Sequence, residues 1–279
     1  MALKSTSNKT MESLCALTRV LPSLILFCAV ACSSAHAQGF AALVSPPRFE
    51  LTVKPGEHLH EVLEISNAGA QSAKFRVKTA DWSLDKNAGV AFHESLQPGS
   101  CRPWVAIERR DITVPAGGKY RYRFEVAPPT EAPSGECRFA LLIEGDEEKV
   151  QASNALAFPI AGRIGVIVYV GVGTNEPRLE IAGTEVGQVN GKVVPLLVIK
   201  NTGNAHGRLT GFLSGTDASG QKLEFTPSTL PILPGETRAI ALVASDERDE
   251  PAIIAYPITI RGNLEWADKT MPFEQRFAP

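Results

Sequence analysis

Histidine is the first residue type to consider for chemistry, because an imidazole can bind a metal or move a proton near neutral pH. The chain contains five histidines, and His58 and His60 have the i, i+2 spacing that places two side chains on one face of a strand. No cysteine or further histidine stands at a spacing that would complete a zinc site with them. We therefore predict that both are surface residues and that the protein holds no metal.

Other catalytic motifs are missing from the sequence. It has no Gly-x-Ser-x-Gly elbow, no phosphate loop and no dinucleotide fingerprint after a predicted strand. The acidic cluster at 144–148 contains a glycine, and its charge density is typical of a solvated loop. We expect a protein that is not an enzyme, needs no cofactor and takes no small-molecule substrate.

The charge balance argues against nucleic acid as a partner. The 279 residues include 28 Lys and Arg against 30 Asp and Glu, spread along the chain, for a formal net charge of -2. No cationic face is expected that could release counterions from a phosphate backbone. With 23 Gly and 20 Pro among 44% hydrophobic residues, the composition indicates many short elements separated by turns, which favours a β protein.

The first 37 residues are predicted to be a signal peptide. Basic residues precede an apolar run at 21–30, and the small-residue motif that ends at Ala37 follows. Since the run is too short to span a bilayer, we expect export and cleavage after Ala37. The alternative is cleavage before Cys32, which would give a lipoprotein, although a lipobox prefers leucine at the position of Ala29.

Two cysteines, Cys101 and Cys137, follow the signal peptide. Exported proteins fold in an oxidising compartment, so a lone pair of cysteines predicts one disulfide. Two unpaired buried thiols are the alternative.

Alternating apolar residues predict strands in several places. In 119–126 the apolar side chains occupy every second position, 48–53 follows the same pattern, and 59–65 follows it less strictly. No apolar stripe with a helical period stands out after the signal peptide. The chain is therefore predicted to be all-β.

An ordered pair of sequence blocks occurs twice along the chain. Block one, 65–69, recurs at 199–203 and ends each time in Asn-x-Gly, which we interpret as turn residues that tolerate a positive φ. Block two, 114–119, recurs at 233–238 as a Pro- and Gly-containing turn before a strand. We predict two similar domains, 38–173 and 174–279, each an immunoglobulin-like β-sandwich.

The most informative segment is 154–160, where Leu156, Phe158 and Ile160 share one face of a predicted strand. Pro159 has no amide hydrogen, so this strand belongs at a sheet edge or a bulge. An edge with large apolar residues can pair with another chain, including a second copy of this one. The alternative is that these residues close the core of the first domain.

The sequence resembles the periplasmic chaperones of the chaperone–usher pathway of pilus assembly, in their divergent archaic or alternative branch. The resemblance covers nearly all of the chain after the signal peptide. Its specific feature is the order of four motifs that are weak individually, at 44–51, 135–144, 154–163 and 201–204. It implies a periplasmic protein with two immunoglobulin-like domains that meet at an angle, like the arms of a boomerang.

The resemblance also implies partners and site residues. Leu156, Phe158 and Ile160 would be donated to a pilin-like subunit that lacks its own final strand, until an outer-membrane usher receives that subunit. Arg48 and Arg163 would bind the C-terminal carboxylate of the subunit. Arg163 stands where the family has lysine, and an ungapped alignment places Gly165 there instead. A tandem immunoglobulin-like surface or adhesion module without chaperone activity is the alternative function.

Overall fold

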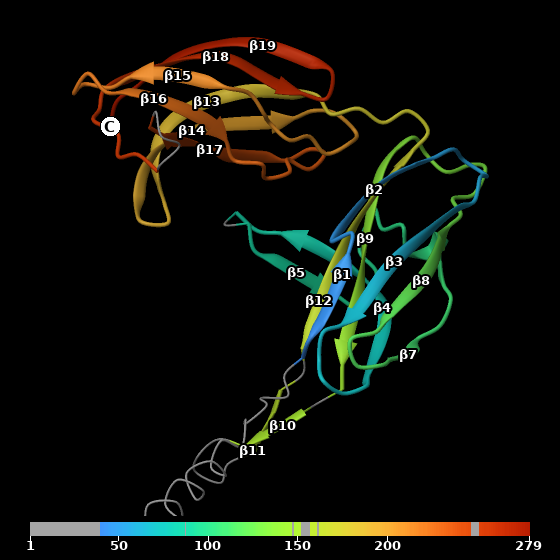
Figure 1. The fold of residues 1–279 in the computed structure, drawn as a ribbon. Coiled ribbons are helices and arrows are strands. Elements are labelled where there is room, and N and C mark those ends of the chain that lie inside the picture. Colours follow the sequence, from blue (N-terminus) through green and yellow to red (C-terminus); the bar gives the residue numbers. More distant parts are fainter. Residues whose placement is uncertain (1–39, 87, 147, 152–156, 161, 247–250) are drawn as a thin grey trace, which may run out of the picture. The chain divides into compact units, whose positions relative to one another are not determined.

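Two β-sheets form the first half of the described chain (Figure 1). The computed structural model describes residues 40–86, 88–146, 148–151, 157–160, 162–246 and 251–279. The first sheet has the order β1-β3-β8-β6 and the second the order β2-β12-β9-β4-β5, with β7 beside β4. The strands of the first sheet are β1 (Ala42–Ser45), β3 (Leu59–Asn67), β6 (Val105–Ile107) and β8 (Lys119–Val126). Those of the second are β2 (Arg48–Val53), β4 (Ala73–Leu84), β5 (Val90–His93), β7 (Asp111–Val114), β9 (Gly135–Gly145) and β12 (Arg163–Val172).

The inner faces of these sheets enclose one hydrophobic core. Tyr122, Phe124 and Val126 on β8 are buried, as the alternation of apolar residues predicts. The ring of Phe124 meets those of Phe49 and Phe139 edge to face, with centroids 5.2 Å and 6.1 Å away. Because Phe49 and Phe139 belong to the second sheet, these contacts join the two layers into a sandwich. The predicted all-β class is confirmed.

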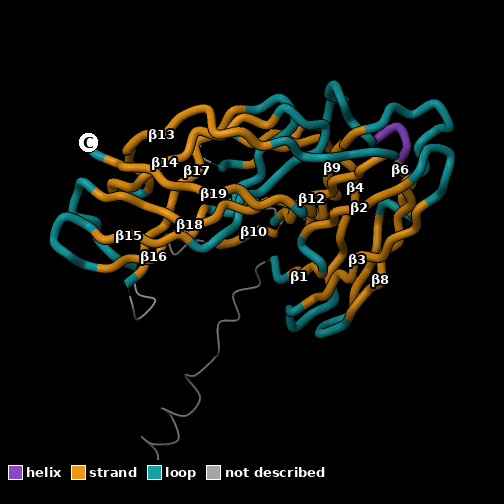
Figure 2. Tube along the Cα trace, turned by 90° about the horizontal axis from the view of Figure 1, so that it is seen from above, coloured by secondary structure: helices purple, strands orange, loops and turns teal. Residues whose placement is uncertain are grey.

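The second half of the chain forms one seven-stranded sheet with its own core. Its strand order is β13-β14-β17-β16-β15-β18-β19. All seven strands contribute to one buried cluster, and β13 contacts β19, so the sheet curls around that cluster. Figure 2 shows these strands in orange. Their bounds are β13 (Leu179–Val189), β14 (Lys192–Asn201), β15 (Leu213–Thr216), β16 (Lys222–Pro227), β17 (Thr237–Ser245), β18 (Ile258–Trp266) and β19 (Lys269–Phe277).

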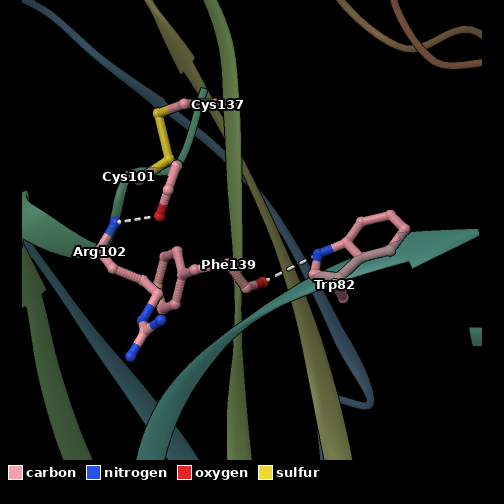
Figure 3. Close-up of a disulfide and its surroundings, with 6 residues drawn as sticks. Trp82, Cys101, Arg102, Cys137 and Phe139 are labelled. Carbon is pink, nitrogen blue, oxygen red and sulfur yellow. Dashed lines mark hydrogen bonds between the residues drawn. A yellow bond between two sulfur atoms is a disulfide. The ribbon is translucent and has the colours of Figure 1, made fainter. Parts of the chain in front are cut away.

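The predicted disulfide between Cys101 and Cys137 is present, with Cα atoms 5.3 Å apart (Figure 3). Cys101 precedes the 3-10 helix η1 (Arg102–Trp104), which is purple in Figure 2, and Cys137 lies on β9. The bond therefore ties a connection between strands to the centre of the second sheet. Among the described residues, no helix is long and apolar enough to cross a membrane.

Removing this disulfide should destabilise the protein substantially. The bond joins residues 36 apart in sequence, and closing a loop of that size stabilises a fold by about 3–4 kcal/mol on the chain-entropy model. We expect the double variant Cys101→Ala with Cys137→Ala to lose that much free energy of unfolding in a urea titration of the mature protein. Equal midpoints for the oxidised parent and the double variant would contradict this.

The two copies of block one have a different role from the one predicted. Neither Asn67 nor Asn201 has a positive φ, and neither do the glycines that follow at 69 and 203. Both asparagines are buried, and each amide nitrogen donates to the carbonyl four residues later, at 2.7 Å and 2.8 Å. Each also donates to a carbonyl where block two begins: that of Val114, the first residue of one copy, at 3.1 Å, and that of Ile232, just before the other copy, at 2.8 Å. The blocks recur together because a buried amide joins them in each half.

Block two does form the predicted turn, with its register shifted by one residue. Gly117 and Gly235 both have a positive φ, 63° and 76°, which favours glycine. The backbone amides of Asn67 and Asn201 donate to the carbonyls that follow these glycines. Gly117 is thus equivalent to Gly235. The two sequence blocks were aligned on their prolines instead, and Pro115 stands two residues before Gly117 whereas Pro234 stands one residue before Gly235.

Candidate functional site

The segment expected to donate side chains forms a separate two-stranded sheet. Strand β11 (Ala157–Ile160) pairs antiparallel with β10 (Glu148–Gln151), with Phe158 opposite Val150. Within the described ranges, no other strand is hydrogen-bonded to β11. Figure 1 shows the pair extending beyond the ends of β9 and β12. One edge of β11 is therefore open in the described structure, as Pro159 favours. Leu156 lies outside the described residues.

The strand ladder changes register where this ribbon joins the sandwich. Glu144 pairs with Arg163 at the end of the β9–β12 ladder, whereas Glu148 pairs with Ile160 at the start of the β10–β11 ladder. The register of the two ladders therefore differs by one residue. This shift marks the base of the ribbon.

An aromatic side chain near the predicted cleavage site lies against this base. A Cβ atom on Gly162 would lie 1.9 Å from Cγ of Phe40, and one on Gly145 would lie 2.7 Å from its Cδ2. The amide of Gly145 donates to the carbonyl of Gly162 at 3.0 Å, which closes the ladder beneath the ring. Phe40 also meets Phe75 edge to face at 6.0 Å. Both glycines are thus required by the close approach of Phe40, a residue that the sequence analysis did not single out.

The open edge continues into β12. This strand pairs with β9 along its whole length but with β2 only from Ile167 onward. Arg163–Val166 therefore has a hydrogen-bonded strand on one side only, counting the described strands. The edge that begins at β11 resumes over these four residues.

Arg48 lies on β2, on the outer face of the second sheet. Its side chain is about half exposed, and its Nε is 2.8 Å from the carboxylate of Glu50. The Cα partner of Arg48 on β12 is Ile167, which packs against the buried cluster of Trp82 and Tyr169 on this outer face. The predicted anchor is therefore accessible, and it already contacts a carboxylate of its own chain.

Arg163 lies on the same face but at a distance along the strand. Its guanidinium is 3.5 Å from the carboxylate of Glu144 and lies 5.8 Å from the ring centre of Phe92. A Cβ atom on Gly165 would be 2.1 Å from Cζ of Phe92, so that ring occupies the space above position 165. Four residues, or ~13 Å of strand, separate Arg163 from Ile167, the partner of Arg48. The described contacts do not bring the two arginines together.

The acidic cluster at 144–148 is only partly the loop that was expected. Glu144 is in β9 and Glu148 opens β10. Lys78 lies 3.1 Å from Glu144 and 2.6 Å from Glu94, which explains how Glu144 is accommodated on a strand. The hydrogen bond between Lys78 and Glu94 raises the pKa of the lysine and lowers the pKa of the carboxyl.

His58 and His60 both lie on the surface, with side chains 63% and 74% exposed. Their nearest charged partner is Glu125, which His58 contacts through Nδ1. In the part of the chain that the structure describes, no three His, Cys, Asp or Glu side chains are grouped so that they could hold a metal ion.

A polar cluster that the sequence analysis missed surrounds Tyr169. Burial raises the pKa of this tyrosine to about 12. The ring of His206 stacks on it at 3.9 Å, and the guanidinium of Arg208 lies 5.9 Å from its ring centre. The one signal in the sequence was that Glu50 stands two residues after Arg48 on a predicted strand and so shares its face. The proximity of His206 and Arg208 to Arg48 and Glu50 could be known only from the structure.

Comparisons with known proteins give structural similarity without sequence similarity. No protein-family model matches the chain, and no curated protein matches its sequence. The class 5 fimbriae chaperone CfaA is 13% identical, with 85% of this chain and 99% of that chain covered and a TM-score of 0.44. The matched chain of the CsuC–CsuE chaperone–tip adhesion subunit complex of Acinetobacter baumannii is 15% identical, with 85% of this chain and 99% of that chain covered and a TM-score of 0.44. The CupB2 chaperone of Pseudomonas aeruginosa is 10% identical, with 85% of this chain and 100% of that chain covered and a TM-score of 0.43.

Proposed function

We propose that this protein is a periplasmic chaperone that binds pilus or related surface-structure subunits by donating a strand to them, and delivers them to an outer-membrane usher. The observation that carries the proposal is the open edge formed by β11 and the first four residues of β12. The motif order of the sequence supports the same function.

The open edge has the backbone chemistry that strand donation needs. A strand bonded on one side only presents a row of free N–H and C=O groups to an incoming chain. Main-chain hydrogen bonds along such an edge supply affinity, and alternate side chains supply specificity by filling pockets. In our proposal Leu156, Phe158 and Ile160 are those side chains. Three large apolar residues at about 1.5–3 kcal/mol each would contribute roughly 5–9 kcal/mol before the costs of association.

Arg48 and Arg163 remain the proposed anchors for the subunit's C-terminal carboxylate. A guanidinium can hold a carboxylate by two parallel hydrogen bonds, which fixes orientation as well as charge. Two observations support the assignment of Arg48: its side chain is accessible, and its Nε lies 2.8 Å from the carboxylate of Glu50.

Replacing Arg48 with alanine tests the function directly. The mature protein should keep a strand-deficient pilin-like subunit soluble in a one-to-one complex, and Arg48→Ala should weaken that complex by ~100-fold or more, because losing one partner of a desolvated charge pair costs about 2–5 kcal/mol. Co-purification and titration measure both results. The exposed Arg261 on β18 provides a matched control, Arg261→Ala, which should bind normally.

A parent protein that leaves the subunit insoluble would refute the chaperone function and favour the surface or adhesion module. Circular dichroism of Arg48→Ala should match that of the parent, since an exposed ion pair contributes only about 0–1 kcal/mol to stability.

A further inference from the structure

The outer face of the second sheet carries a phenylalanine that lies above the open edge. Strand β4 is paired with β9 as far as Ala80, and its last four residues pair with β5 instead. Phe92 on β5 has Trp82 as its Cα partner and packs, partly buried, against the apolar cluster of this face. Its ring occupies the space above Gly165, which lies in the stretch of β12 that is bonded to β9 alone among the described strands. An aromatic ring therefore borders the edge at which we propose that a subunit binds.

Gly165 is matched to this ring. A Cβ atom at position 165 would lie 2.1 Å from Cζ of Phe92 and 2.7 Å from its Cε1, so any other residue would displace the ring. The Cα partner of Gly165 on β9 is Leu142, which is fully buried on the same face. Phe92 thus supplies the side chain that position 165 lacks, and it does so at the border of the sheet.

A strand added beside Arg163–Val166 would bring its own side chains to Phe92. Neighbouring strands lie about 4.8 Å apart, and residues directly opposite each other project to the same face of the sheet. The partner's residue opposite Gly165 would therefore project onto the outer face. Because Gly165 has no side chain, this residue would contact the ring of Phe92 in place of a side chain of β12.

The charged groups around the ring are paired with one another. The guanidinium of Arg163 lies 5.8 Å from the ring centre and 3.5 Å from the carboxylate of Glu144. Lys78 lies 3.1 Å from Glu144 and 2.6 Å from Glu94. These two cations and two carboxylates balance, so they do not favour a charged side chain of either sign. An aromatic side chain gains from contact with the edge of another ring and from stacking on a guanidinium.

We propose that Phe92 is a specificity-determining residue of the strand-donation site, and that it selects an uncharged aromatic side chain at the subunit position that pairs opposite Gly165. This inference rests on the proposed function and adds a chemical preference to it. In the proposed complex, Leu156, Phe158 and Ile160 fill the subunit's groove, whereas Phe92 contacts the outer face of the subunit's strand. The two contacts come from different strands of the chain and can be tested separately.

Three synthetic peptides test this preference without an identified subunit. Each has an N-terminal fluorophore, two lysines at either end for solubility, and nine residues in which Val alternates with Tyr, Ser or Glu. Alternation keeps the second residue type on one face of the added strand in whichever register the peptide binds. Fluorescence anisotropy with the mature protein should give ~5-fold tighter binding of the Tyr peptide than of the Ser peptide, a ratio typical of one aromatic pair. The Glu peptide should bind no more tightly than the Ser peptide.

Variants of Phe92 assign the preference to its ring. Phe92→Ala should reduce the preference for the Tyr peptide to less than ~2-fold and leave the affinity for the Ser peptide unchanged. If that variant fails to fold, Phe92→Leu keeps an apolar cover over Gly165, but it lacks the ring and should lose the same preference. Phe212→Ala is the matched control, because Phe212 is 86% exposed just before β15 and its loss should not affect binding.

The results that would overturn the inference differ from those that would refute the chaperone function. Equal affinity of the parent for the Tyr and Ser peptides, no binding of either, or tighter binding of the Glu peptide would overturn the inference. So would a preference for the Tyr peptide that survives in both Phe92 variants. Failure of the chaperone function would instead leave the subunit insoluble with the parent protein. A subunit that the parent keeps soluble would leave that function standing in each of these cases.

Discussion

Asn201→Ala is expected to lower the free energy of unfolding by about 2–4 kcal/mol. The side chain of Asn201 is fully buried. Its amide nitrogen donates to the carbonyls of Ala205 and Ile232, both at 2.8 Å. Its oxygen accepts from the amides of Gly203 at 2.9 Å and Arg178 at 3.2 Å. Alanine would leave four backbone groups without this partner in a place where few alternatives exist.

The measurement is thermal and urea unfolding of the mature protein, with Thr202→Ala as the control. Thr202 is exposed, and its hydroxyl makes only longer contacts, at 3.4 Å and 3.2 Å, so its loss should change stability by less than about 0.5 kcal/mol. Asn201→Asp is a finer probe, because it keeps the accepting oxygen and loses the donating nitrogen. Asn67→Ala should show a parallel loss. A loss below about 0.5 kcal/mol for Asn201→Ala would refute the bridging role.

These asparagines show where reading the sequence succeeds and where it stops. The order of the repeated blocks was visible, because recurrence in a fixed order is a property of the sequence itself. The reason for it was not, because Asn201 contacts Ile232 across 31 residues and nothing in the local spacing indicates that contact. The local interpretation as turn residues with a positive φ is therefore wrong for Asn201, and the positive φ belongs to Gly235 instead.

Strand alternation was predictable for a different reason. A period of two determines which side chains face the core, so β8 and β2 could be predicted from adjacent residues alone. The contacts on the outer face of the second sheet could not be predicted in this way. Phe92 covers Gly165 only because β5 folds back beside β4, and the contact of Glu50 with Arg208 joins residues far apart in sequence. Alternation predicts the face of the sheet on which a side chain lies, but it does not predict which other residues pack over that face.

Phe158→Glu is expected to abolish subunit capture, with a loss of ~100-fold or more in affinity, and to change the melting temperature of the free protein by less than about 2 °C. In the proposed complex, position 158 enters an apolar groove of the subunit, where a carboxylate would lack a partner. In the free protein, the backbone of β11 is bonded only to β10 among the described strands, outside the two sheets that enclose the core. Ala157→Glu is the matched control, because it adds the same charge one residue away on the opposite face of the alternation and should retain most of the affinity. A fall of several degrees in the melting temperature of Phe158→Glu alone would show that the residue closes the protein's own core, and would refute strand donation through Phe158 whatever happened to binding.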